Sequence, residues 1–334
     1  MTKPAFLLTA SPHLGSGDST PTIMWSVVAS LVPVVGASVY YFGPSAVLVI
    51  SAATLGAVLA ERVFGPKGAL RDGSATITGV LLGLTLPPGL PIWMAFIGGG
   101  FGIGFGKLIF GGLGQNIFNP ALLGRAFLQA AFPVALTTWP ALGGSWWSLR
   151  GDNLALPLMS ASVPDAITGA TPLGLMKFEQ VTTDYSDLMI GSIGGSLGET
   201  SGIIILVGGL YLALRNHLNW RIPISIFVTV AVLAAVIHAL SPERYPTALF
   251  MLFSGGLMLG AVYMATDMVT SPVTNKGCWV FGFGIGFLVV VIRLWGGLPE
   301  GVMYAILLMN AMVPFINRAT QPRVFGTGLR EVST

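Results

Sequence analysis

The sequence predicts an all-α protein that crosses a membrane about ten times. Of its 334 residues, 53% are hydrophobic and 9% are charged, whereas a soluble domain carries about 25% charged residues. The mean hydropathy is +0.80. Because so few charges cannot cover a water-facing surface, we expect most of the helices to face lipid. A short segment that occurs twice in the chain further predicts two related halves.

The apolar stretches are long enough for helices that cross a membrane, each of which takes roughly 17–25 residues. The expected spans are residues 23–43, 44–62, 74–88, 91–110, 117–133, 199–214, 222–240, 247–266, 277–294 and 299–317. The third span is short and ends at two prolines. The sixth follows a glycine-rich segment, which weakens a regular helix. Short or glycine-broken spans at matching places in two halves indicate a binding site.

Lysine and arginine residues are distributed unequally between the connections of these spans. With the N-terminus inside, the cytoplasmic set is Lys3, Arg62, Lys67, Arg71, Lys107, Arg215, Arg221, Lys276, Arg318, Arg323 and Arg330. The outer set is Arg150, Lys177 and Arg244. Positive residues concentrate in cytoplasmic connections. We therefore expect both termini in the cytoplasm and the interval 134–188 on the outer face.

An internal repeat supports the division into halves. The segment from Phe101 to Phe105 recurs from Phe283 to Phe287, and a glycine pair follows each copy. The copies fall in the fourth and ninth spans, and five spans per half is an odd number, so the halves are expected to have opposite orientations, as inverted repeats do in transporters. The expected organisation is a cytoplasmic tail (1–22), a five-helix repeat (23–133), an outer loop (134–188), a second five-helix repeat (189–317) and a cytoplasmic tail (318–334).

The longest polar interval contains the segment from Asp165 to Pro172, which reads D-x-x-[S/T]-G-A-T followed by proline. This pattern resembles the site at which a flavin transferase attaches FMN, through its phosphate, to a threonine hydroxyl. By that resemblance Thr171 carries the flavin, and Asp165, Thr168, Gly169 and Ala170 complete the attachment motif. The alternative is a turn of small residues ended by Pro172. These eight residues alone leave both interpretations open.

Two further polar segments could contact a flavin ring. Asp72 and Ser74 stand at the start of the third span, where they either cap the helix or contact an isoalloxazine or a cation. Gln115, Asn116 and Asn119 lie between the fourth and fifth spans. Their side chains can donate and accept hydrogen bonds, which suits the edge of a flavin, or they satisfy broken backbone inside the membrane.

Two carboxylates at span ends are candidates for an ion pathway. Glu199 begins the sixth span, and Asp267 follows the eighth. A carboxylate in or near a membrane span is a functional hypothesis by default, because it is costly there. A helix-start role for Glu199 and a capping or loop role for Asp267 are the alternatives.

Other chemistry is disfavoured. A single cysteine, Cys278, cannot hold an iron–sulfur cluster, and the three histidines are far apart with no metal-binding spacing. An electron carrier in this chain must therefore be organic, and we expect no bound metal. No basic patch for nucleic acid is present.

Taken together, these segments resemble one family over nearly the whole chain. The sequence looks like the D subunits of Rnf complexes, the ion-translocating ferredoxin:NAD⁺ oxidoreductases. It is also similar to the B subunits of the sodium-translocating NADH:quinone reductases. The matching segments run from Ser11 to His13, Asp72 to Ala75, Gly111 to Ala121, Thr168 to Thr171, Gly191 to Ser201, Ala265 to Asp267 and Arg293 to Gly297.

The resemblance implies a fold of two inverted five-helix halves, similar to urea transporters. It implies covalent FMN on Thr171, with Thr168 where serine is usual, and a second, noncovalent riboflavin among the helices. It also implies an inner-membrane subunit that relays electrons for Na⁺ or H⁺ translocation and has no complete catalytic cycle alone. Its partners would be an outer-face FMN-carrying subunit, membrane and ferredoxin- or NAD-side subunits, a flavin transferase and lipid.

Three alternatives remain open from the sequence. The absence of the longer N-terminal extension expected of the quinone-reductase B subunit favours the Rnf type over that subunit. A flavin-free channel or transporter for a small solute has the same architecture, and covalent flavin fluorescence in a denaturing gel distinguishes it. A quinone-reducing subunit would show quinone-sensitive activity in the purified complex.

Overall fold

The computed structural model describes residues 18–140, 145–157, 169–199 and 201–322. These residues form helices, and they include no β-strand. Five of the helices, α1, α2, α10, α13 and α14, are long and apolar enough to cross a membrane, and α3, α4 with its extension, and α9 are shorter apolar helices. The protein is therefore a multi-pass membrane protein, as the sequence predicts.

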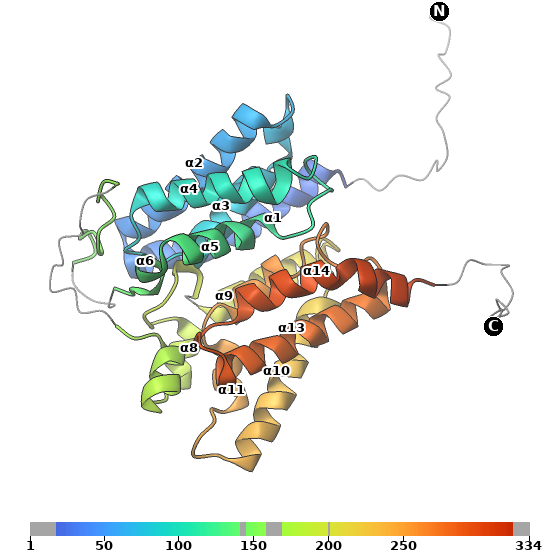
Figure 1. Cartoon of the computed structure of the whole chain (residues 1–334). Helices are drawn as coiled ribbons and strands as arrows, with labels where there is room; N and C mark the ends of the chain where they lie inside the picture. Colours follow the sequence, from blue (N-terminus) through green and yellow to red (C-terminus); the bar gives the residue numbers. More distant parts are fainter. Residues whose placement is uncertain (1–17, 141–144, 158–168, 200, 323–334) are drawn as a thin grey trace, which may run out of the picture.

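The first half of the protein is the group of helices drawn from blue to green in Figure 1. Its elements are α1 (Thr20–Phe42), α2 (Pro44–Phe64), η1 (Ala69–Asp72), α3 (Ser74–Thr85), α4 (Ile92–Ile103), the π-helix η2 (Gly104–Leu108), α5 (Pro120–Ala131) and α6 (Pro133–Thr137). Proline stands in the first turn of α1, α2 and α5, where its missing N–H costs nothing.

The second half follows a connecting segment and is drawn from yellow to red. The connecting segment contains α7 (Pro172–Gly174), the π-helix η3 (Leu175–Glu179), α8 (Tyr185–Ile190) and η4 (Leu197–Glu199). The second half consists of α9 (Gly202–Leu214), α10 (Arg221–Leu240), α11 (Ala248–Phe253), α12 (Leu257–Leu259), the π-helix η5 (Gly260–Met264), α13 (Asn275–Trp295) and α14 (Val302–Thr320).

The eighth expected span, 247–266, is not one continuous helix. It divides into α11, α12 and η5, and Ser254, the residue that follows α11, has an extended backbone. Gly255 follows with φ of +64°, a left-handed conformation that glycine adopts without steric cost. The expected span therefore contains a broken helix, which hydropathy does not reveal because it stays high across the break while the backbone turns.

Two helix pairs form the most extensive contacts, α2 with α4 and α10 with α13. Each depends on glycine at the crossing. A Cβ on Gly99 of α4 would collide with the Ala53 carbonyl of α2, and one on Gly286 of α13 would collide with Ile226 and Thr229 of α10. Small residues allow such close approach where lipid provides no hydrophobic driving force between helices.

The two halves meet along α1 with α9 and α5 with α14, and η4 of the connecting segment packs against α3. Tyr263 in η5 donates a hydrogen bond to the Ser30 carbonyl of α1 at 3.2 Å, and Asn119 donates to the Met264 carbonyl at 3.1 Å. The main core cluster contains buried residues from both halves. Two of the cavities described below are lined by residues of both halves.

Candidate functional site

Thr171 begins the short helix α7 and caps its first turn. Its Oγ1 accepts a hydrogen bond from the Gly174 N–H at 3.2 Å, and Pro172 occupies the first helical position. The turn that the sequence offered as an alternative is therefore present, and it holds the Thr171 hydroxyl in a defined place. Gly169 donates its N–H to the Trp139 carbonyl at 3.0 Å. Asp165 and Thr168 lie outside the described residues.

A cavity of about 430 Å³, here called the outer cavity, is lined by Thr171. Ala170, Arg125, Glu199 and Glu300 also line it. The structure thus brings Glu199 and the attachment motif together, although the sequence treats them as separate candidates. Ligand pockets typically measure about 300–1,000 Å³, so the outer cavity has the size of a ligand site.

Charged side chains from both halves meet at the outer cavity. Arg125 of α5 forms an ion pair with Glu300, with 3.1 Å between Nη2 and Oε2. The other carboxylate oxygen of Glu300 accepts the Gly256 N–H at 2.5 Å. Glu199 is buried, and its Oε1 accepts a hydrogen bond from the Ser196 hydroxyl at 2.9 Å. Glu300 therefore ties Arg125 of the first half to the broken helix of the second.

A second cavity, here called the inner cavity, has a volume of about 90 Å³. It is lined by four of the predicted site residues, Ser74, Asn116, Asn119 and Asp267. Lys107, His217 and Tyr263 are further polar residues of the lining. Asp72 and Gln115 are not among its lining residues, and Gln115 is exposed.

Several of these predicted residues have structural hydrogen bonds. Asn119 caps α5, because its Oδ1 accepts from the N–H groups of Ala121 at 3.0 Å and Leu122 at 3.3 Å. Asp72 accepts from the Ser74 N–H at 2.8 Å and hydroxyl at 2.6 Å.

Asp267 has a similar turn-forming role, since it accepts from the Val269 N–H at 3.2 Å and the Thr270 hydroxyl at 3.1 Å. The capping and turn roles that the sequence offered as alternatives are therefore present in the structure. The same residues also lie at or beside the inner cavity.

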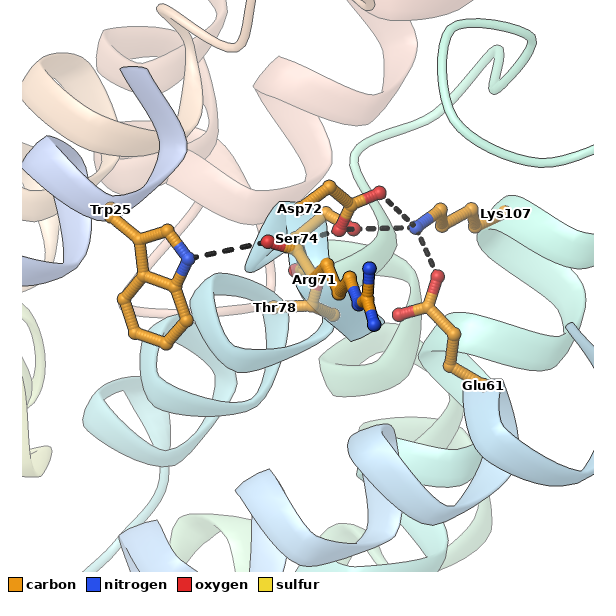
Figure 2. A network of polar contacts seen from close by, with 7 residues as sticks. All are labelled: Trp25, Glu61, Arg71, Asp72, Ser74, Thr78 and Lys107. Carbon is orange, nitrogen blue, oxygen red and sulfur yellow. Dashed lines mark hydrogen bonds and ion pairs between the residues drawn. The ribbon is translucent and has the colours of Figure 1, made fainter. Parts of the chain in front are cut away.

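Figure 2 shows a buried polar network beside the inner cavity. Lys107 at the end of the fourth span forms an ion pair with Glu61 of α2 and donates to the Ser74 hydroxyl at 2.5 Å. Asp72 Oδ2 lies 3.9 Å from the Lys107 ammonium. Glu61 and Lys107 are 1% and 3% exposed, and Glu61 Oε2 has no hydrogen-bond partner.

Sequence reasoning misses this pair as a site, because Lys107 counts there only as a cytoplasmic charge and Glu61 has no assigned role. A usable signal is present, since each residue lies inside an expected apolar span, where a charge requires a partner. The two residues are 46 positions apart in the sequence, so whether they pair depends on how α2 crosses α4.

His217 connects the start of α1 with the segment between α9 and α10. Its Nδ1 lies 2.6 Å from the Ser26 hydroxyl oxygen, and its Nε2 lies 3.7 Å from a carboxylate oxygen of Asp18. The sequence assigned this histidine no role. Its position in the lining of the inner cavity shows that both halves supply the polar groups there.

The chain belongs to the family described as NQR2, RnfD, RnfE, which it matches over residues 7–326. It is 41% identical over 339 residues to the D subunit of the proton-translocating ferredoxin:NAD(+) oxidoreductase complex of Clostridium ljungdahlii, with 97% of each chain covered. It is 41% identical over 335 residues to the D subunit of the ion-translocating oxidoreductase complex of Stutzerimonas stutzeri, with 94% of each chain covered.

A third relative is the D subunit of the Na(+)-translocating ferredoxin:NAD(+) oxidoreductase complex of Acetobacterium woodii. The identity is 37% over 327 residues, covering 96% of this chain and 95% of the relative. The family resemblance of the sequence motifs is confirmed. The relatives' names include both a proton and a sodium complex, so family membership does not choose between the two ions.

The buried pair makes a testable prediction about stability. Lys107→Met leaves the Glu61 carboxylate buried without its partner, and breaking a buried pair from one side costs about 3–5 kcal/mol. We expect a large fall in the melting temperature of the detergent-solubilised protein. The double variant Glu61→Gln/Lys107→Met removes both charges and should recover most of the loss. Arg62→Gln, at the exposed neighbouring position, is the control, and an equal loss in it would contradict the prediction.

Proposed function

We propose that this chain is the membrane electron-transfer subunit of an ion-translocating ferredoxin:NAD⁺ oxidoreductase complex, with covalent FMN on Thr171. Full-length similarity to D subunits of three ion-translocating oxidoreductase complexes supports the complex. The observation that carries the flavin assignment is the position of Thr171 in the lining of a ligand-sized cavity that also contains Arg125. The subunit would act as part of this redox enzyme complex and not as a complete enzyme.

The outer cavity suits a phosphate-linked flavin in size and in chemistry. Its volume of about 430 Å³ lies within the usual range for ligand pockets. Trp139, Phe178 and Tyr304 offer aromatic surface, and Arg125 offers a guanidinium that suits a phosphate. Bound FMN would supply one-electron chemistry, while the protein fixes its position and surroundings.

The residues of this cavity have distinct proposed roles. Thr171 provides the hydroxyl oxygen for the phosphoester, and its hydrogen bond from Gly174 fixes the side chain. Arg125 supplies positive charge and is held in place by Glu300. Asp165, Thr168, Gly169 and Ala170 form the segment that a flavin transferase would recognise.

We propose that riboflavin binds in the inner cavity after this cavity widens. Asn116 and Ser74 offer polar groups there, and Lys107 offers a positive charge. The present volume of about 90 Å³ is below the range of ligand pockets, so neighbouring side chains would have to move. Asn119 has its side-chain oxygen and nitrogen engaged in α5 capping and in the bond to Met264, so it would shape the wall more than bind a ring.

Glu199 and Asp267 are proposed to take part in Na⁺ or H⁺ passage. Glu199 lies in the outer cavity and Asp267 in the inner cavity. Residues of both halves line each of these cavities. A movement of one half relative to the other would therefore change the surroundings of both carboxylates. The turn-forming hydrogen bonds of Asp267 make Glu199 the stronger of the two candidates.

We further propose a ten-span fold of two inverted five-helix halves, similar to urea transporters. The packing supports it, since the pairs α2–α4 and α10–α13 occupy matching positions in the two halves. The broken segment of α11, α12 and η5 matches the short α3 in the order of elements. The chain would lie in the bacterial inner membrane with both termini cytoplasmic and Thr171 outside, facing an FMN-carrying partner subunit. Other membrane subunits and subunits on the ferredoxin and NAD side would complete the complex.

The main test is the substitution Thr171→Ala, which removes the only oxygen able to form the phosphoester. We expect complete loss of covalent flavin fluorescence from the denatured band, with protein still in the membrane. Loss of the cap should cost about 1 kcal/mol. Thr171→Ser keeps both the cap and the hydroxyl and is the matched control. Fluorescent Thr171→Ala protein, or a flavin peptide that maps to Thr182 or Thr183, would show that the assignment is wrong.

The ion-pathway proposal predicts that Glu199→Gln impairs ion coupling more than flavin loading. Glutamine retains the size and can keep the bond from Ser196, but it removes the carboxyl group that can bind or release a cation or a proton. Ion uptake and electron transfer are measured together in proteoliposomes of the complex, and the ratio of the two should fall. Glu179→Gln, a carboxylate of the same cavity that is exposed, is the control. An unchanged ratio in Glu199→Gln removes this residue from the pathway.

The orientation predicts opposite accessibility of two introduced cysteines. In a Cys278→Ser background, which removes the single native thiol, Val181→Cys should react with a membrane-impermeant thiol reagent in outer-permeabilised cells. Lys67→Cys should react only after the inner membrane is opened. Both positions are exposed, so accessibility within the protein does not limit labelling. The reverse pattern would place Thr171 in the cytoplasm.

A further inference from the structure

A third cavity, of about 130 Å³, lies beside α7 and the ends of α10 and α13. We call it the cationic cavity, because Lys177, Arg244 and Arg293 line it and no carboxylate does. Leu173 lines both this cavity and the outer cavity, so the two are neighbours on the Thr171 side of the protein. Neither the electron-transfer proposal nor the ion pathway assigns it a role.

Two of the cations of this cavity are held by backbone carbonyls. Lys177 donates to the carbonyls of Gly296 at 2.6 Å and Leu298 at 2.9 Å, just after α13. Arg293 donates from its two terminal nitrogens to the carbonyls of Met251 at 2.5 Å and Ser254 at 2.9 Å. These bonds fix the positions of the two cations, and Arg293 also interacts electrostatically with the Glu300 and Glu199 carboxylates. Burial lowers the pKa of Lys177, as expected for a charge without a carboxylate partner.

Two features of these cations favour a ligand. Arg293 is 3% exposed, and its Nε has no hydrogen-bond partner among the described residues. The exposed guanidinium of Arg244 lies over the Tyr245 ring, with its carbon 5.6 Å from the ring centroid. Within the described ranges, none of the three cations forms an ion pair within 4.0 Å. A buried polar atom without a partner and three cations outside ion pairs favour an anion.

The cavity also lies at a membrane boundary. Trp295 is the last residue of α13, a helix long enough to span the membrane, and it is 58% exposed. The Tyr245 ring centroid lies 6.3 Å from that of Trp295. Tryptophan and tyrosine favour the level of the lipid headgroups. An anion in this cavity would therefore be at headgroup depth.

The distribution of positive charge makes the cavity more specific. The sequence places three basic residues on the Thr171 side of the spans, and two of them, Lys177 and Arg244, line this one cavity. Arg293 at the end of α13 adds a third charge. Positive residues are otherwise scarce on this side, so their concentration beside exposed aromatic rings fits a headgroup phosphate better than a diffuse surface charge.

We propose that the cationic cavity binds the phosphate group of an anionic phospholipid headgroup in the leaflet on the Thr171 side. Arg244 donates to the phosphate oxygens, and Arg293 contributes positive charge from the cavity wall. Lys177 contributes charge while it caps α13, and the acyl chains lie along the exposed apolar surface at the end of α13. A lipid so placed packs against the segment that carries Thr171, because Leu173 and Met176 line the same cavity.

The test compares lipid retention by the purified complex in a neutral detergent. The probes are phosphatidylglycerol and phosphatidylcholine, supplied in equal amounts and counted on the complex by native mass spectrometry. Arg244→Gln should reduce phosphatidylglycerol retention about fivefold, as expected for one basic residue at a membrane surface, with little change for phosphatidylcholine.

The chain offers a matched control, Arg215→Gln. Arg215 is exposed and lies over the Tyr211 ring at 5.5 Å, the same kind of contact that Arg244 makes, but it does not line the cavity. It should not change phosphatidylglycerol retention.

Three outcomes would overturn the proposal. Equal phosphatidylglycerol retention by the wild type and Arg244→Gln would show that Arg244 holds no lipid. Displacement of the lipid by an excess of inorganic phosphate would assign the cavity to a soluble phosphate. Loss of a neighbouring subunit from the Arg244→Gln complex, with lipid retention unchanged, would assign it to an acidic protein segment. Flavin fluorescence is measured in the same samples. Lipid retention and flavin loading are then two separate readouts, so failure of the lipid proposal is distinguished from failure of the flavin assignment.

Discussion

Backbone groups at helix breaks must find partners within this protein, because the surrounding lipid offers none. The break after α11 shows how this is done. Arg293 donates to the carbonyls of Met251 and Ser254, and Glu300 accepts the N–H of Gly256. At the end of α13, Lys177 donates hydrogen bonds to the carbonyls of Gly296 and Leu298. Arg293, Glu300 and Lys177 are therefore held in place by the backbone groups that they satisfy.

This constraint also explains why the cavities lie where they do. A regular helix leaves no polar backbone for a ligand or an ion, whereas a broken helix brings in charged side chains that remain partly available. Glu300 uses one oxygen for Gly256 and the other for Arg125. Arg293 uses two nitrogens and leaves Nε without a partner. The outer and cationic cavities are each lined by a side chain that satisfies this break, Glu300 and Arg293 respectively, and both are lined by Leu173.

Hydropathy and residue spacing were sufficient to predict most of the helices. The expected spans 23–43 and 44–62 correspond closely to α1 and α2, because long apolar runs in this range of lengths have few other structures available in a membrane. The same reasoning does not reveal the break inside 247–266, because the apolar run continues through it. Hydropathy measures where a segment lies and not how its backbone turns.

The site was predictable only in parts. Thr171, Glu199 and Asn116 could be recognised from local motifs, since each stands in a polar or glycine-rich segment between apolar runs. The partners Arg125 and Glu300 could not, because they are 175 positions apart and meet only when α5 packs beside α14. The pair of Glu61 and Lys107 likewise depends on the close crossing of α2 and α4, which the glycines permit but do not specify.

The helix α5 joins the two cavities between the halves. Asn119 and Ala121 at its start line the inner cavity, and Arg125 and Gln129 farther along line the outer cavity. At 1.5 Å per residue, Ala121 and Arg125 are separated by roughly 6 Å along the axis. Asn119 is bonded to Met264 and Arg125 to Glu300, so each end of this helix segment is tied to the second half. A shift of α5 relative to the second half would therefore alter the polar contacts of both cavities together. Of the helices described, α5 thus places polar contacts to the second half at both cavities.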